Sequence, residues 1–323
     1  MSASSRGGSS PRWTQIAERG SLWGLRFSVW CYRVLGRRVA TLLAHVIVTY
    51  FFLTDGRGRR SSAAYLRRVR ATPEGRAHLR SRPGLWECFL HYREFALVIV
   101  DRVGLWFGGG GDFEFESHGV EYFDRLTEEG RGSIVVGAHM GNFDALRLLA
   151  VRARTVVNVL MFTDHAQHIN RILRELSPHA EARVIRVAPD SVRAVFEVRR
   201  CLERGEVVAM LGDRVEPTDR GRTGRVTLLG GEVELPQAPF LLAGLLGCPV
   251  VFMLALREGA GRYRVYCHPI ADRLRLRPRE RGAETAKLVS AYAELLERYC
   301  VRSPYQWFNF FDYWGELGGG RPR

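Results

Sequence analysis

A short apolar run that leads into a histidine and an aspartate constrains this chain most. Residues 133–137 (Ser-Ile-Val-Val-Gly) are typical of a buried strand, and residues 145–151 are typical of a helix. His139 follows the expected strand, and Asp144 lies five residues later, at the start of the expected helix. Because positions i and i+5 of a regular helix point about 140° apart, the two side chains can meet only if His139 precedes the helix and Asp144 lies in its first turns.

This turn also suggests a chemistry. Gly141 permits an unusual backbone conformation, and Asn142 is a good N-cap for the helix. A histidine oriented by a carboxylate, beside the free N–H groups of a helix start, can act as a general base toward a hydroxyl. A loop histidine that only satisfies a nearby carbonyl is the plain alternative on this pair alone. We expect no metal, because no third ligand stands nearby at a useful spacing.

Helical and strand patterns alternate along most of the chain. Helices are expected at 61–102 with breaks at Pro73 and Pro83, and at 120–128, 168–176, 191–204, 236–246 and 284–300. Strands are expected at 113–116, 133–137, 156–162, 206–211, 249–256 and 262–268, with a turn at 108–111. This alternation predicts an α/β fold with a mixed central sheet flanked by helices.

The N-terminal part has a different character. Residues 1–12 are rich in serine and glycine and are expected to be disordered. Residues 13–60 are expected to anchor the chain to a membrane, since Val39–Leu53 carries no charge. A helix of that length covers about 22 Å, less than a hydrocarbon core of about 30 Å. A marginal span, an interfacial helix and a buried helix hairpin are therefore all compatible with the pattern. The expected domain covers 61–314, with a flexible tail at 315–323.

Charge and cysteine usage narrow the class of partner. The formal net charge is +14, from 48 Lys+Arg against 34 Asp+Glu, which favours anionic surfaces. No nucleic-acid-binding signature accompanies this charge, so we expect an anionic membrane surface rather than nucleic acid. The six cysteines are scattered, as in a reducing compartment, and form neither a zinc site nor a compact disulfide framework.

Three further segments are candidates for function. Asp213 and Arg214 follow the strand expected at 206–211, and strand ends of α/β sheets carry ligands. Arg222 and Arg225 lie in an expected flexible basic loop that could grip phosphate, although it is no P-loop. A plain turn and a solvated loop are the alternatives. Residues 304–314 contain seven aromatic side chains, which suits either packing on the domain or a membrane interface.

Taken in order, these segments resemble the bacterial lipid A biosynthesis (lauroyl/myristoyl) acyltransferases of the lysophospholipid acyltransferase superfamily. The resemblance is carried by Ala138–Asp144, by Gly205–Asp213 and by Leu228–Gly230 with residues 236–249. Departures after Asp213 and in the aromatic tail indicate a divergent subgroup. The resemblance implies a glycerol-phosphate acyltransferase-like fold with an N-terminal membrane-associated segment.

The resemblance also implies an activity. A fatty acyl group would pass from a thioester, expected on acyl carrier protein, to a hydroxyl of a membrane glycolipid, without a cofactor. His139 would take the hydroxyl proton and Asp144 would hold the imidazole. Asn142, Asp213, Arg214, Arg222 and Arg225 would bind substrate. The expected location is the bacterial inner membrane, with the catalytic domain facing the cytoplasm.

Three other functions remain possible from the sequence. A glycerol-phosphate or lysophospholipid acyltransferase would share the His139–Asp144 motif. A non-catalytic membrane protein that binds lipid or carrier protein could keep the motif as a vestige. A thioesterase would release free acid from the thioester without any acceptor.

Overall fold

A computed structural model of the chain describes residues 22–79, 82–107, 113–146, 155–162, 183–187, 192–215, 219, 222–275 and 279–315. The expected disordered start, the turn at 108–111, the helix at 168–176 and nearly all of the tail at 315–323 lie outside these residues. Within them the structure confirms an α/β fold with a mixed sheet and flanking helices.

The central sheet has seven strands in the order β1-β9-β8-β2-β5-β3-β4. Neighbouring strands are parallel except for β8 and β9, which form an antiparallel hairpin. The strands are β1 (Glu114–His118), β2 (Ser133–Gly137), β3 (Val157–Phe162), β4 (Arg183–Val187), β5 (Val207–Leu211), β8 (Val250–Gly259) and β9 (Arg262–Ala271). The sequence did not predict β4.

The two faces of the sheet support two hydrophobic cores. All five residues of β2 are buried, as expected for a parallel strand covered on both sides. Ile134 and Val136 point into one core with α9 (Ala238–Leu246) and α10 (Arg281–Arg302). Val135 points into the other core with α5 (Glu121–Glu128). Helix α8 (Val192–Glu203) packs beside β4 and β5.

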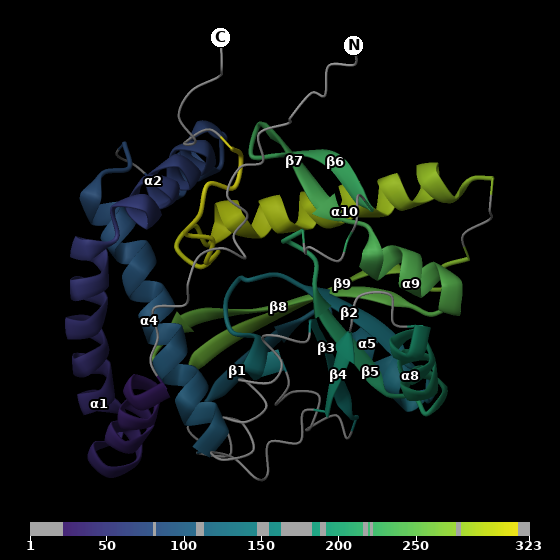
Figure 1. Ribbon diagram of the computed structural model, residues 1–323, viewed down its shortest axis with the longest axis horizontal. Helices are drawn as coiled ribbons and strands as arrows, with labels where there is room; N and C mark the ends of the chain where they lie inside the picture. The colour runs from purple at the N-terminus through teal and green to yellow at the C-terminus, as the bar shows by residue number, and fades with distance from the viewer. Residues whose placement is uncertain are drawn as a thin grey trace, which may run out of the picture.

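The N-terminal helices form a layer beside the sheet (Figure 1). They are α1 (Leu22–Thr54), α2 (Gly56–Ala71), α3 (Gly75–His78) and α4 (Leu85–Phe107). The helices end around Pro73 and Pro83, as the sequence predicted. Gly36 has a φ of 79° and kinks α1, so its long second part begins at Arg37.

The long part of α1 packs antiparallel along α4. Arg37 pairs with Asp101 at 2.6 Å, and Arg93 donates from Nε to His45 Nε2 at 3.0 Å. By length and composition, Trp30–Thr54 is the one helix in the described residues that could cross a membrane. Its outward face is exposed and apolar; we call it the α1 stripe, and it consists of Val39, Leu42, Val46, Tyr50 and Leu53.

A β-hairpin replaces the end of the expected basic loop, and the helix expected at 236–246 follows it as α9. Strands β6 (Thr223–Leu228) and β7 (Gly231–Pro236) pair antiparallel across a two-residue turn. Leu229 and Gly230 both have positive φ there, at 49° and 71°, as a type I′ turn requires. The hairpin is stable because Leu228 and Leu235 bury their side chains in the core beside α10.

The C-terminal aromatic segment, residues 304–314, packs back on the domain. Trp307 is fully buried against Tyr65 of α2, with ring centroids 5.1 Å apart. Met140 and Trp307 form an isolated antiparallel bridge. Of the two alternatives considered for this segment, packing on the domain is therefore the one observed.

Candidate active site

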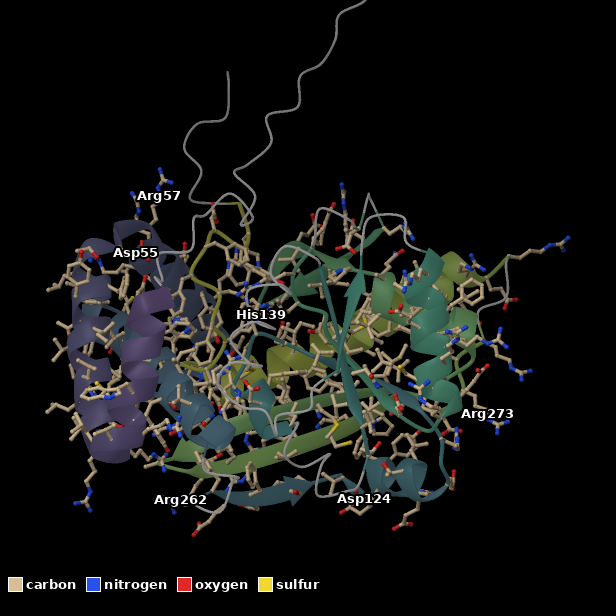
Figure 2. All side chains as sticks on the ribbon, turned by 60° about the horizontal axis from the view of Figure 1, so that its bottom comes forward. Asp55, Arg57, Asp124, His139, Arg262 and Arg273 are labelled. Atoms are coloured by element: carbon tan, nitrogen blue, oxygen red, sulfur yellow. The ribbon has the colours of Figure 1, made fainter. Side chains whose placement is uncertain are left out.

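The register of two neighbouring strands brings His139 and Asp213 together. Gly137 of β2 pairs with Leu211 of β5, and each candidate residue follows its strand by two positions. Asp213 Oδ1 accepts a hydrogen bond from His139 Nδ1 at 2.8 Å, and Oδ2 accepts one from the His139 backbone N–H at 3.0 Å. Figure 2 shows His139 in the middle of the molecule, with Arg57, Arg262 and Arg273 at its periphery.

Asp213 is completely buried and satisfied by several donors. Besides His139, its Oδ2 atom accepts from Trp307 Nε1 at 2.9 Å and from Asn309 Nδ2 at 3.3 Å. Its backbone carbonyl accepts from the Tyr313 hydroxyl. Such donors are what a buried carboxylate needs to stay ionised.

The electrostatics of the pair favour a charged Asp213 beside a neutral His139. Burial opposes ionisation of Asp213, but the attraction of His139, together with Arg214 and the Trp307 hydrogen bond, holds its pKa well below the usual range. Burial lowers the pKa of His139, and the positive charges of Arg214 and Arg102 add to this, while Asp213 opposes it. The His139 side chain still keeps 30% of its surface exposed.

This arrangement fixes the tautomer that a general base requires. An ionised carboxylate can only accept hydrogen bonds, so His139 carries its proton on Nδ1. The lone pair then lies on Nε2, where it can take a proton from a hydroxyl group. Asp213 would stabilise the imidazolium that results, as the carboxylate of a catalytic triad does.

The structure does not place Asp144 where the sequence motif suggested. Its Oδ2 atom accepts from Arg102 Nε at 2.6 Å and its Oδ1 atom from Trp106 Nε1 at 3.1 Å, both on α4. The imidazole Nδ1 that Asp144 was expected to hold is bonded to Asp213. The reason is geometric: the helix begins at residue 143, so Asp144 is directed by the helix start toward α4, while His139 stays at the strand end.

Asn142 supports the loop that carries His139. It is fully buried, and its Oδ1 atom accepts from the Asp144 backbone N–H at 3.1 Å, which makes it the N-cap. Its Nδ2 atom donates to the Tyr263 hydroxyl at 3.1 Å. Both ends of its amide therefore make hydrogen bonds inside the protein, and substrate binding by Asn142 stays a prediction.

Gly141 meets a steric requirement of the same loop. Its φ is 63°, and a Cβ atom built there would lie 2.1 Å from the Ala255 carbonyl oxygen. Its backbone N–H donates to the Gln306 carbonyl at 2.9 Å. Only glycine lets the backbone at residue 141 lie this close to the Ala255 carbonyl. The loop that carries His139 is thereby held between β8 and the C-terminal aromatic segment.

Of the three candidate arginines, the structure brings only Arg214 to the site. Arg214 donates from Nε to Asn309 Oδ1 at 2.7 Å and from Nη2 to the Phe308 carbonyl at 3.0 Å. Arg222 and Arg225 instead lie exposed at β6, where Arg225 faces Glu234 at 3.6 Å. No bond between these two arginines and His139, Asp213 or Arg214 is found among the described residues.

Sequence reasoning missed several residues of the site. Trp307 and Asn309 contact Asp213, and Arg102 and Trp106 hold Asp144. The aromatic richness of residues 304–314 was a signal for burial but not for this contact. Arg102 and Trp106 lie four residues apart on one helix face, yet nothing in the sequence ties them to Asp144.

Comparison with known families identifies the family of this chain. A profile of bacterial lipid A biosynthesis acyltransferases matches residues 91–315, more than two thirds of the chain. The chain belongs to this family. It is therefore an acyltransferase, and the matched range includes His139, Asp144, Asp213 and the C-terminal aromatic segment. Curated protein sequences show no match to the chain.

The described residues contain no group of three or more His, Cys, Asp or Glu side chains that could hold a metal ion. All six cysteines are buried and free.

Proposed function

We propose that this acyltransferase moves a fatty acyl chain from an acyl thioester to a hydroxyl of a lipid A-like glycolipid. The observation that carries the proposal is the 2.8 Å hydrogen bond from His139 Nδ1 to the buried Asp213, in a chain of this family. The bond leaves a basic Nε2 atom on a side chain that is 30% exposed.

The reaction needs one proton to move twice. His139 Nε2 takes the proton of the acceptor hydroxyl while the hydroxyl oxygen attacks the thioester carbonyl carbon. The tetrahedral intermediate collapses, the carbon–sulfur bond breaks, and the imidazolium returns the proton to the departing sulfur. The products are an ester and a free thiol. The donor is acyl carrier protein in this proposal, and no acyl-enzyme is required.

Asp144 acts indirectly in this scheme. Its carboxylate holds Arg102, and the positive charge of Arg102 helps keep His139 neutral. Arg214, which follows Asp213 in the chain, also lowers the pKa of His139, although the burial of His139 contributes more. Arg222 and Arg225 remain candidates for contact with an anionic headgroup, because both are exposed.

We further propose that α1 binds the cytoplasmic face of the bacterial inner membrane in the plane of the surface. The α1 stripe offers apolar side chains, and Arg57 and Arg60 at its end are exposed. A span across the bilayer would bury the neighbouring α4, which carries Arg93, Glu94 and Asp101, in hydrocarbon. Charged side chains at that depth are costly, so an interfacial position is favoured.

The decisive experiment is an assay with purified full-length enzyme, an acyl thioester and a lipid A precursor in detergent micelles. We expect an ester product from the wild type and a loss of about 10²–10⁴-fold in rate for His139→Ala. Acyl carrier protein and coenzyme A thioesters are compared as donors. Thioester cleavage with free acid as the sole product would instead indicate a thioesterase.

The membrane proposal has its own test in vesicle sedimentation. Leu42→Asp with Val46→Asp places two charges on the α1 stripe. A fully buried leucine or valine contributes roughly 1.5–3 kcal/mol, so binding should weaken by at least about tenfold. Phe196→Asp on α8 is the matched control, since Phe196 is 57% exposed but belongs to no such stripe. Equal binding by both variants would contradict the assignment.

A further inference from the structure

The C-terminal aromatic segment contributes directly to the geometry of the His139–Asp213 pair. We propose that Trp307 and Asn309 are positioning residues, whose N–H groups hold the Asp213 carboxylate in the orientation that bonds His139. This inference rests on the proposed function of His139 as the base. It assigns to a segment 94 residues or more beyond Asp213 in the chain a role in the chemistry.

The contacts of the two carboxylate oxygens differ. Oδ1 of Asp213 accepts from His139 Nδ1, whereas Oδ2 accepts from the indole of Trp307, the amide of Asn309 and the His139 backbone. Because three donors reach Oδ2 and one reaches Oδ1, rotation of the carboxylate would break several hydrogen bonds at once. They therefore fix the direction of the lone pair that faces the imidazole.

The segment is itself rigidly held. The Phe308 backbone N–H donates to the His139 carbonyl at 2.8 Å. The Trp307 carbonyl lies 2.9 Å from Nε2 of His91, a fully buried histidine whose Nδ1 atom contacts Ser62 Oγ at 2.9 Å. Trp307 has no exposed surface. Because Trp307 is buried and its backbone is hydrogen-bonded, its indole N–H keeps a fixed position relative to the Asp213 carboxylate.

Removing a donor has a defined electrostatic consequence. A carboxylate with fewer hydrogen bonds attracts a neighbouring imidazolium more strongly, so the pKa of His139 rises. Among the described residues, the charged and titratable groups that face the pair are Arg102 from α4, Arg214 after β5, Tyr292 and Cys300 from α10 and Tyr313 from the C-terminal aromatic segment. Only Tyr313 among them packs against the Trp307 ring, with centroids 4.7 Å apart, and phenylalanine keeps an aromatic ring at that position. The direction of the shift is therefore set by the lost donor.

The test compares two tryptophans of the same segment. Trp307→Phe removes the donor to Asp213, while Trp314→Phe removes a donor to the Leu228 carbonyl, 3.2 Å away. The acid limb of kcat/KM against pH is measured for full-length protein with the acyl thioester and acceptor of the assay above. For Trp307→Phe we expect the limb to move upward by roughly 0.3–1 pH unit, with kcat about tenfold lower. Trp314→Phe should keep the wild-type limb.

Asn309→Ala provides the second variant, in case Trp307→Phe does not fold. Its bond to Asp213 is longer, so a smaller upward shift is expected. The variant also removes the bond from Arg214 Nε to Asn309 Oδ1, while Arg214 keeps its bond to the Phe308 carbonyl. If the folded variants show unshifted acid limbs, or if Trp314→Phe shifts equally, the positioning role is wrong. A separate outcome, full activity of His139→Ala, would refute the proposed function instead.

Discussion

Replacing Asp213 by asparagine should abolish the base while leaving the fold intact. Three donors converge on Oδ2 of Asp213, from Trp307, Asn309 and the His139 backbone. The amide oxygen of asparagine must take that position, which turns the amide NH2 group toward His139 Nδ1. Nδ1 must then accept, so the ring proton moves to Nε2 and the catalytic lone pair is lost.

The magnitude follows from this tautomer change. A histidine held in the wrong tautomer loses about 10⁴-fold in kcat in a comparable triad, and loss of a general base costs about 10²–10⁴-fold. We therefore expect a fall of about 10³–10⁴-fold for Asp213→Asn. For Asp144→Asn we expect about tenfold, because it perturbs the contacts with Arg102 and Trp106 beside the site and leaves the His139–Asp213 bond in place.

The assay is ester formation at saturating substrate, with His139→Ala as the baseline and melting temperature as the control for folding. The ordering of the two carboxylate variants decides the question. Should Asp144→Asn fall to the His139→Ala baseline while Asp213→Asn stays active, the His139–Asp213 bond would not be the catalytic arrangement.

Three further predictions concern the surroundings of the site. Gly141→Ala should lower both activity and melting temperature, because the added Cβ would lie 2.1 Å from the Ala255 carbonyl oxygen. Gly230→Ala is the matched control, since Gly230 has a similar positive φ (71°) but no atom within 4 Å of an added Cβ. It should lower the free energy of unfolding by only about 1–2 kcal/mol, from backbone strain, and keep activity. Arg214→Ala should raise the Michaelis constant of one substrate more than the other, with partial rescue by lysine; equal small effects together with a lower melting temperature would show that Arg214 only ties down the C-terminal aromatic segment. His91 is neutral in the fold because burial lowers its pKa to about 4 from 6.5, so stability should be full above pH 6.5 and fall by about 3 kcal/mol as pH drops toward 4. Urea unfolding at pH 7 and pH 5 tests this, because about 2 kcal/mol of the loss should already be present at pH 5, and a loss of the same size in His91→Asn would assign it to other groups.

Local patterns were sufficient to predict most elements of the fold. The apolar run at β2, the helix breaks at Pro73 and Pro83, and the helix start after Asn142 depend on neighbours in sequence. Each follows from periodicity, proline geometry or capping. The β6–β7 hairpin was missed because its turn contains Leu229 at positive φ, where asparagine or glycine is the usual signal.

The partner of His139 could not be obtained in this way. Asp213 lies 74 residues away, and its position depends on the pairing of Gly137 with Leu211. The sequence placed Asp213 at a strand end near His139 but assigned it to substrate binding. The register between two strands that are neighbours in the sheet but distant in the sequence is a tertiary property. The spacing of side chains along the chain does not reveal it directly.

The two aspartates of the site illustrate how a motif and a contact can differ. The five-residue spacing of His139 and Asp144 is visible in the sequence because both flank one turn, and that turn is built by Gly141 and the N-cap Asn142. The same N-cap starts the helix at residue 143 and thereby directs Asp144 toward Arg102. Asp213, in contrast, reaches His139 across the sheet and is buried where its charge acts most strongly. In this arrangement the motif builds the loop and places Asp144 beside Arg102, while the neighbouring strand supplies the carboxylate that His139 needs for its proposed role as a base.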